Sequence, residues 1–239
     1  MHDVARAARG GVRGLVFDLD GTLVDSYQAI AASVNEARAT FGLVPLLVDE
    51  VRRRVGRGLE SLMEDMVGRE RVEEGVAVFR THYAGIFAAS TSALPGALPT
   101  LRELRRRGYR LAVASNKPAR FGEPILRGLG MRGFLDAVEG PDTAGSTKPH
   151  PAMIERCLRE MGVQPSEAIY VGDMVLDVET GERARIDVVL VAGGSSSLED
   201  LRGTGRAVLS SVAGLLDLLP GPPSPREAPG ESGRVGGSP

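Results

Sequence analysis

The stretch Leu15–Ser26 constrains the fold more than any other part of the sequence. A short apolar run ends in two acids, a glycine and a threonine, with Asp18–Thr22 reading DLDGT. An apolar run of this length before a glycine predicts a buried strand that ends in a turn. In a parallel sheet, Asp18 would then lie at the carboxyl end of its strand, where open α/β folds bind ligands. Asp18 and Asp20 share a face of an extended chain and could converge on one substrate.

An ordinary solvated Asp-Gly turn after an edge strand would also fit this stretch taken alone. Two carboxylates at such a short distance repel each other unless they share a cation or a proton. The functional interpretation is favoured because three later stretches supply the cation ligands and positive charge that such a site needs.

The region from about Asp25 to Ser92 has apolar residues at helical spacing and no convincing strand. Residues 25–28 resemble a capping box, which predicts a helix that starts near Asp25. We therefore expect an all-helical subdomain over residues 25–92, inserted between the first and second strands of the core. The alternative, in which these helices simply cover the sheet, is weaker because no strand alternates with them.

Strands and helices alternate again over residues 93–219, which together with 14–24 form the predicted core. Such alternation predicts an α/β fold with a mainly parallel sheet covered by helices on both faces. The strands are expected at about Gly14–Asp18, Arg110–Ala114, Ala137–Glu139, Ala168–Val171 and Val188–Val191. Helices are expected at about Arg120–Leu129, Pro151–Met161, Leu176–Arg185 and Val212–Leu219.

The ends of the chain differ from this core. Residues 1–13 are arginine-rich without the apolar region of a secretory signal, and residues 220–239 are dominated by Pro, Gly and Ser. Both are expected to be flexible. The single cysteine, Cys157, excludes an internal disulfide and fits a cytoplasmic location. A net charge of -2 and 4% aromatic residues argue against nucleic-acid partners, and no apolar run is long enough for a membrane span.

Lysine is rare in this sequence. Of the 29 basic residues, only Lys117 and Lys148 are lysines, and both stand in polar stretches that follow or precede core elements. A compact ammonium group on a flexible stem can bind a phosphate as a point charge in a space too narrow for a forked guanidinium. The two lysines are therefore candidates for contacts with an anion.

Four polar stretches follow or lie beside predicted strand ends, and together they suggest phosphoryl transfer. Asp18 can attack phosphorus as a carboxylate nucleophile, and Asp20 can serve as general acid and base. Oxygens of the phosphoryl group can be held by Ser115, Asn116, nearby backbone N–H groups and Lys148. Asp173, with Asp18 and Asp177, offers the oxygen ligands that Mg²⁺ prefers.

These stretches resemble the four motifs of the haloacid dehalogenase superfamily, most closely its phosphoglycolate phosphatase-like branch. The motifs are residues 18–26, Ser115-Asn116-Lys117, Lys148-Pro149, and Gly172-Asp173 through Asp177, and the resemblance spans roughly residues 14–219. It implies a Rossmann-like three-layer core with an inserted helical cap. It also implies Asp18 as nucleophile, Asp20 as acid–base, and Mg²⁺ bound by the Asp18 carboxylate, the Asp20 backbone carbonyl and Asp173, with Asp177 assisting.

Within the cap, residues 55–59 (VGRGL) resemble the substrate-facing loop of the family, which makes Arg57 a candidate substrate contact. An ordinary surface arginine in a segment rich in them is the alternative. The sequence departs from relatives in two places. Ile186 stands where relatives usually have a glycine before the next strand, and residues 193–197 lack the usual aromatic-Gly segment.

The expected function is a magnesium-dependent phosphatase that hydrolyses a small phosphate monoester, with 2-phosphoglycolate as first candidate. A β-phosphoglucomutase-type phosphomutase and a pyrophosphatase share the same phosphate-binding parts and stay open. The dehalogenase branch is disfavoured because it lacks the acid at Asp20. A phospho-acceptor signalling domain is about half as long and does not need Asp20. A phosphate-binding module without activity would not need the intact motifs. The sequence does not indicate whether the protein is a monomer or a homodimer.

Overall fold

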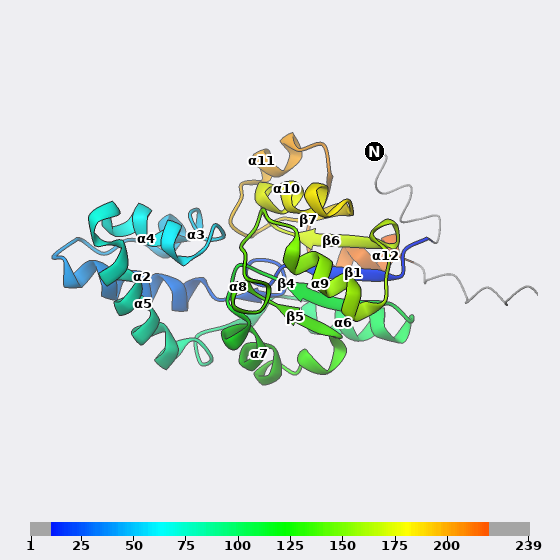
Figure 1. Cartoon of the computed structure of the whole chain (residues 1–239), viewed down its shortest axis with the longest axis horizontal. Helices are drawn as coiled ribbons and strands as arrows, with labels where there is room; N and C mark the ends of the chain where they lie inside the picture. Colours follow the sequence, from blue (N-terminus) through cyan, green and yellow to red (C-terminus); the bar gives the residue numbers. More distant parts are fainter. Residues whose placement is uncertain (1–10, 220–239) are drawn as a thin grey trace, which may run out of the picture.

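The structure is a computed structural model that describes residues 11–219 (Figure 1). The expected flexible segments over residues 1–10 and 220–239 lie outside the described residues. Residues 11–13 differ from the expectation of a loose leader, because Val12 is buried in the core. Arg13 donates its backbone N–H to Glu167 and accepts one from Arg110. The packed part of the core therefore begins at Val12, before the first strand.

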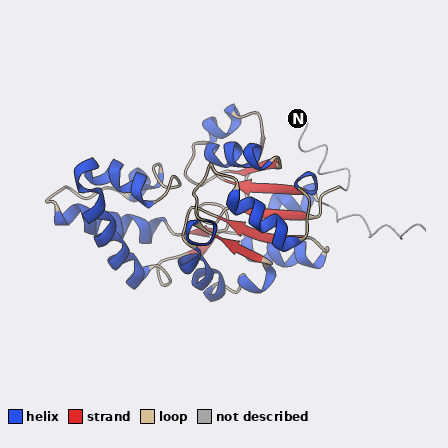
Figure 2. Ribbon diagram, in the orientation of Figure 1, coloured by secondary structure: helices blue, strands red, loops and turns tan. Residues whose placement is uncertain are grey.

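A six-stranded sheet forms the centre of the core, in the order β5-β4-β1-β6-β7-β8. Neighbouring strands all pair in parallel, as the red arrows of Figure 2 show. The bounds are β1 Gly14–Phe17, β4 Arg110–Ala114, β5 Ala137–Glu139, β6 Ala168–Gly172, β7 Asp187–Val191 and β8 Ala207–Leu209. The sequence analysis predicted five of these strands and missed β8. The mainly parallel α/β fold is confirmed.

Alternating side chains of the strands build two apolar layers. Leu15 and Phe17 of β1 belong to one buried cluster, and Val16 between them belongs to the other. Because successive side chains of a strand point to opposite faces, one strand contributes to both layers. Helices α6 Ala97–Arg106, α7 Ala119–Gly128 and α12 Leu215–Leu218 cover the first face, and α9 Ala152–Met161, α10 Val175–Ala184 and α11 Leu198–Gly203 cover the second. The result is the expected three-layer core.

Short elements complete the core, and one cysteine packs inside it. They are α8 Pro141–Ala144 and the 3₁₀ turns η2 Arg132–Phe134, η3 Pro165–Glu167 and η4 Val212–Gly214. Cys157 is fully buried, and its thiol donates a hydrogen bond to the Val113 carbonyl. Burial raises the pKa of this thiol, so Cys157 acts as a packing residue. Among residues 11–219, no helix has the length and apolar character needed to cross a membrane.

The helical cap stands beside the core and carries its own apolar cluster (Figure 1, left). Its helices are α2 Tyr27–Thr40, α3 Val48–Arg52, α4 Leu59–Val67 and α5 Val72–Ile86, with a 3₁₀ turn η1 at Arg69–Arg71. The cluster joins α2, α4 and α5 through residues such as Val34, Met63 and Phe79. Helices this short are marginal alone, so their packing against one another stabilises the cap.

Two crossings of the chain connect the cap to the core. Strands β2 Val24–Asp25 and β3 Ser92–Ala93 pair antiparallel at this junction. The domain boundaries predicted near these residues stay predictions. No strand was predicted there, because a two-residue pair has no readable periodicity. The expected capping box is also absent. The Ser26 hydroxyl donates to Asp20 instead, and Asp25 accepts the backbone N–H of Tyr27.

Helix α10 ends in an unusual way. Arg185 adopts φ 59°, a left-handed conformation that favours glycine. The family resemblance implied a glycine at residue 186, and the residue in the left-handed conformation is Arg185, one position earlier. A left-handed L-residue costs roughly 1–2 kcal/mol. The glycine of this helix lies at Gly181 instead, where a Cβ would come within 2.2 Å of the Val188 side chain, so the helix packs closely on β7.

We predict that Arg185→Gly stabilises the protein. Removing the Cβ relieves the left-handed strain and should raise the free energy of unfolding by up to about 1 kcal/mol. Arg183→Gly, in the same helix at ordinary helical geometry, should lower it by about 1 kcal/mol. Urea unfolding followed by circular dichroism measures both, and equal destabilisation by the two variants would contradict the prediction.

Candidate active site

The predicted site residues converge because three parallel strands end at one edge of the sheet. Phe17 of β1 pairs in register with Val113 of β4 and Val171 of β6. Asp18 follows β1, Ser115 follows β4 and Asp173 follows β6, so their side chains leave the sheet at the same edge. The backbone N–H of Asp18 donates to Val171 at 2.8 Å, which continues the ladder to the site.

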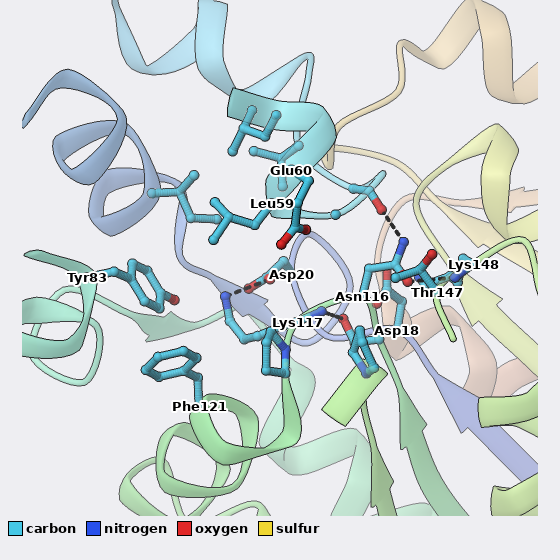
Figure 3. A pocket seen from close by; sticks show the side chains of 18 of the residues that line it. Asp18, Asp20, Leu59, Glu60, Tyr83, Asn116, Lys117, Phe121, Thr147 and Lys148 are labelled. Carbon is cyan, nitrogen blue, oxygen red and sulfur yellow. Dashed lines mark hydrogen bonds and ion pairs between the residues drawn. The ribbon is translucent and has the colours of Figure 1, made fainter. Parts of the chain in front are cut away.

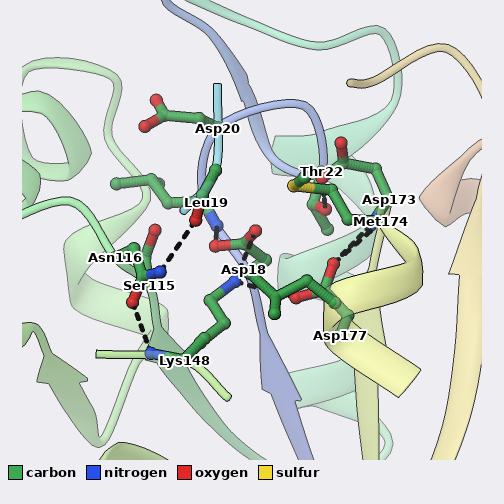
Figure 4. Close-up of polar contacts among 12 residues, drawn as sticks. Asp18, Leu19, Asp20, Thr22, Ser115, Asn116, Lys148, Asp173, Met174 and Asp177 are labelled. Atoms are coloured by element: carbon green, nitrogen blue, oxygen red, sulfur yellow. Dashed lines mark hydrogen bonds and ion pairs between the residues drawn. The ribbon is translucent and has the colours of Figure 1, made fainter. Parts of the chain in front are cut away.

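Three buried carboxylates form the centre of the site (Figure 4). Asp18, Asp173 and Asp177 each place a carboxylate oxygen within 4.8 Å of the others, and exposure of all three residues is 4% or less. Lys148 lies among them, with its Nζ 2.7 Å from Asp18 Oδ2 and 2.8 Å from Asp177 Oδ1. One ammonium group thus balances three carboxylates. The excess negative charge makes this cluster suitable for a cation.

Burial and mutual repulsion disfavour ionisation of the carboxylates in this cluster. Burial raises the pKa of Asp18 to about 6, although Lys148 acts in the opposite direction. Burial also raises the pKa of Asp173 well above its ordinary range, and the neighbouring Asp18 and Asp177 raise it further. A buried carboxylate resists ionisation unless an opposite charge offsets the lost hydration. A divalent cation between these oxygens would provide that charge.

Asp177 orients the other groups of the cluster. Its Oδ1 accepts from Lys148 and from the Tyr170 hydroxyl at 3.1 Å. Its Oδ2 accepts the backbone N–H groups of Asp173 at 3.0 Å and Met174 at 2.9 Å, at the start of α10. Each oxygen of Asp177 therefore already has two donors. The assistance of Asp177 to a metal stays a prediction, whereas the structure contains its ion pair with Lys148.

Asp173 is held by two residues that the sequence analysis did not single out. Thr22 donates its hydroxyl to Oδ1 at 3.0 Å, and the backbone N–H of Ser195 donates to Oδ2 at 2.7 Å. The Ser195 hydroxyl lies 3.0 Å from the Tyr27 hydroxyl of cap helix α2. The segment that lacks the family's aromatic-Gly pattern thus joins the cap to the acid cluster. Thr22 lay within the first motif, but no sequence signal pointed to Tyr27 or Ser195.

The turn after Asp20 depends on a glycine. Gly21 has φ 83°, and a Cβ there would come within 2.6 Å of Asp173 Oδ2 and 2.4 Å of the Tyr27 hydroxyl. A side chain at this position would push into both groups. The DLDGT sequence therefore lets the chain turn directly against the acid cluster.

Asp20 lies in the same cavity, but its side chain faces the cap. Oδ2 is 2.8 Å from Nζ of Lys117, and Oδ1 accepts the Ser26 hydroxyl. The side chain is outside the group of three carboxylates; its predicted metal contact was through the backbone carbonyl. Lys117 is buried, and although burial alone lowers its pKa, Asp20 raises it overall. Both lysines of the chain are thus bound to site carboxylates.

Asn116 connects three segments around the predicted phosphate site. Its Nδ2 donates to the Gly56 carbonyl of the cap at 2.7 Å, and its Oδ1 accepts the Lys148 backbone N–H at 2.7 Å. Ser115 beside it is buried and accepts the Lys117 backbone N–H at 3.3 Å. The amide of Asn116 therefore holds the cap loop, and the phosphate contacts predicted for Ser115 and Asn116 stay predictions.

A cavity of about 320 Å³ lies between the core and the cap (Figure 3). Asp18, Asp20, Ser115 and Lys148 line its core side. Apolar and aromatic residues of the cap and of α7 line the other side, including Ile30, Leu59, Leu62, Phe79, Tyr83 and Phe121. Such a cavity can hold a small ester with its phosphate at the acid cluster and the rest of the molecule toward the cap.

Arg57 lies apart from this arrangement. Its neighbours Gly56 and Gly58 line the cavity, but the Arg57 side chain is exposed and is not among the residues that line it. The contact between Arg57 and substrate stays a prediction, and it would need the side chain to turn inward.

Comparison with known proteins agrees with this architecture. Residues 15–191 match the family described as haloacid dehalogenase-like hydrolases. Phosphoglycolate phosphatase of Aquifex aeolicus is 36% identical over 183 residues, covering 77% of this chain and 86% of the relative. Phosphoglycolate phosphatase of Rhodospirillum rubrum is 35% identical over 219 residues, covering 87% and 90%.

Solved structures show the same fold. The crystal structure of a predicted phosphoglycolate phosphatase from Haemophilus somnus superposes with a TM-score of 0.81 at 25% identity, covering 87% of this chain and 98% of that one. A predicted phosphatase from Clostridium acetobutylicum gives 0.78 at 25% identity, covering 86% and 97%. The chain belongs to the haloacid dehalogenase-like hydrolase family and, within it, to the phosphoglycolate phosphatase-like enzymes.

Proposed function

We propose that the protein is a Mg²⁺-dependent phosphatase that hydrolyses a small phosphate monoester through a phosphorylated Asp18, with 2-phosphoglycolate as the first candidate substrate. The observation that carries the proposal is the position of Asp18. Its carboxylate lies at the end of β1, 2.7 Å from Lys148, beside two further acids and at the wall of a cavity between the core and the cap. The names of the relatives support the substrate, and the single cysteine supports a cytoplasmic location.

The first step is transfer of the phosphoryl group to the enzyme. A carboxylate oxygen of Asp18 attacks phosphorus, the bond to the ester oxygen breaks, and Asp20 gives a proton to the leaving oxygen. Lys148 and Ser115 would hold the phosphoryl oxygens, and this is supported by the contact of Lys148 with Asp18 and the burial of Ser115. Positive charge and donors at these oxygens stabilise the transition state. Asp18 is fixed for attack because its Oδ1 accepts the N–H of Leu19 at 2.7 Å.

The second step returns Asp18 to its free form. Asp20, now a carboxylate, takes a proton from water, the water oxygen attacks phosphorus, and the bond to Asp18 breaks with release of phosphate. The residues that would hold Mg²⁺ are Asp18 and Asp173, with Asp177 assisting, and the close grouping of the three carboxylates supports this assignment. The ion would offset the repulsion between an anionic substrate and the carboxylates. The cap excludes other water from the cavity during both steps.

Asp18→Asn should lower turnover of 2-phosphoglycolate by about 10³-fold or more, because an amide is not a nucleophile. Phosphate release measures turnover, and intact-protein mass after rapid quenching measures the phosphorylated enzyme in the wild type. Circular dichroism checks that the variant is folded. A variant that keeps near wild-type activity would show that the nucleophile lies elsewhere.

Mg²⁺ should stabilise the protein, and by more at pH 7.5 than at pH 5. The folded-state pKa of Asp18, about 6, lies above its ordinary value of 3.8, so the metal-free fold loses stability as pH rises through this window. A cation binds the ionised carboxylates and reverses that loss. At a Mg²⁺ concentration a hundredfold above its dissociation constant, the melting temperature should rise by about 5–10 °C.

The matched variants for this measurement are Asp173→Asn, which should lose most of the Mg²⁺ shift, and Glu179→Gln. Glu179 is exposed on helix α10, which follows Asp173, and it pairs with Arg183. Glu179→Gln should therefore retain the rise in melting temperature caused by Mg²⁺. A Mg²⁺ shift that is equal in the wild type and in Asp173→Asn would place the metal elsewhere.

A further inference from the structure

The hydroxyl of Tyr83 is buried at the cavity without a hydrogen-bond partner. Tyr83 comes from cap helix α5, is 3% exposed and lines the cavity. Within residues 11–219 its hydroxyl oxygen makes no hydrogen bond of ordinary geometry, and Lys117 is close enough for the two groups to shift each other's pKa. Figure 3 shows the hydroxyl directed toward Lys117 and Asp20 rather than into the cap.

Packing alone does not account for a tyrosine at this position. Its ring stacks on Phe79 and Phe87 at centroid distances of 5.3 and 5.8 Å and meets the edge of Phe121 at 5.3 Å. A phenylalanine would make the same ring contacts. A buried hydroxyl that lacks a partner destabilises the protein, because it has lost its hydrogen bonds to water. The hydroxyl is therefore placed for a group that the cavity receives.

The surroundings of the hydroxyl define that group. The Lys117 Nζ lies 5.1 Å from the centroid of the Tyr83 ring, so a cation and a hydroxyl donor face the same part of the cavity. Burial raises the pKa of Tyr83, which keeps the hydroxyl protonated and able to donate. Such a pair favours an anionic acceptor such as a carboxylate. Among the other cations that line the cavity, Lys148 is held by Asp18 and Asp177 at the predicted phosphate end, and Arg80 and Arg120 have side chains that are about half exposed, whereas Lys117 is buried.

This position also bears on Asp20. Both of its oxygens accept hydrogen bonds, one from Ser26 and one from Lys117, so the side chain of Asp20 is held by these two residues. An anion bound at Tyr83 and Lys117 would share the ammonium group and loosen its bond to Asp20. A substrate with a carboxylate beyond the ester oxygen would thus help to free the acid that it needs.

We propose that Tyr83 and Lys117 form the subsite for the substrate's non-phosphate end, and that this subsite selects phosphate esters of short hydroxy acids by their carboxylate. The inference rests on the proposed phosphatase function. It assigns substrate selection to the cap helix α5 and the loop after β4, and gives Tyr83 the role of a specificity-determining residue.

The test compares two esters that differ in the carboxylate, 2-phosphoglycolate and ethyl phosphate, with the full-length enzyme and Mg²⁺. In the wild type, kcat/KM should favour 2-phosphoglycolate. Tyr83→Phe should lower kcat/KM for 2-phosphoglycolate about tenfold or more, mainly through KM, because it removes a hydrogen bond to a charged group. The value for ethyl phosphate should change less than twofold. The melting temperature of Tyr83→Phe should be unchanged or higher, since the lost hydroxyl had no partner.

Tyr109→Phe is the matched control. Tyr109 is equally buried but precedes β4, at the edge of the sheet away from the site, and its change should leave the ratio of the two kcat/KM values unaltered. Equal hydrolysis of both esters by the wild type, or a Tyr83→Phe effect that is absent or equal for both, would overturn the inference while the phosphatase function stands. Release of phosphate from neither ester nor from p-nitrophenyl phosphate would overturn the proposed function and the inference together.

Discussion

The cluster of three buried carboxylates around one lysine is the constraint on which the rest of this structure depends. Carboxylates in a low-dielectric interior repel each other and resist ionisation, so they need fixed donors and a cation. Thr22, Ser195 and Tyr170 supply donors from three different parts of the chain. The parallel sheet brings these parts together because its strands end at one edge. The fold therefore positions the donors that stabilise the buried carboxylates.

The cap is attached to the same cluster at several points. The Tyr27 hydroxyl of α2 contacts Ser195, whose backbone holds Asp173. The Gly56 carbonyl accepts from Asn116, which also holds the backbone of Lys148. Phe121 of α7 packs against Tyr83 and Phe87 of the cap. Movement of the cap would therefore disturb the groups that position both the acids and the lysine, which links access to the cavity with the geometry of the site.

The sequence predicted the parts of the fold that repeat and the parts of the site that lie in motifs. Convergence of Asp18 and Asp173 could be predicted, because polar residues after parallel strands must meet at one edge. Asp177 in α10 and Lys148 in the loop before α9 do not follow strands, and they were assigned to the site through their motifs. Their catalytic roles remain proposals. The strand β8 was missed because it has three residues of intermediate burial, and β2 and β3 are shorter still. Contacts between distant segments, such as Tyr27 with Ser195, have no local signal. Tyr83 fitted a helical apolar stripe, and periodicity does not show which hydroxyl faces a cavity.

The scarcity of lysine has a chemical consequence. Arginine supplies the positive charge of the protein surface, while Lys117 and Lys148 are both buried at the cavity in ion pairs with acids. The whole sequence has no other lysine. A reagent directed at lysine amines, such as an acylating label or an aldehyde, can therefore react with a lysine of this protein only by entering the cavity. Lysine labelling would report access to the cavity rather than exposure of the protein surface.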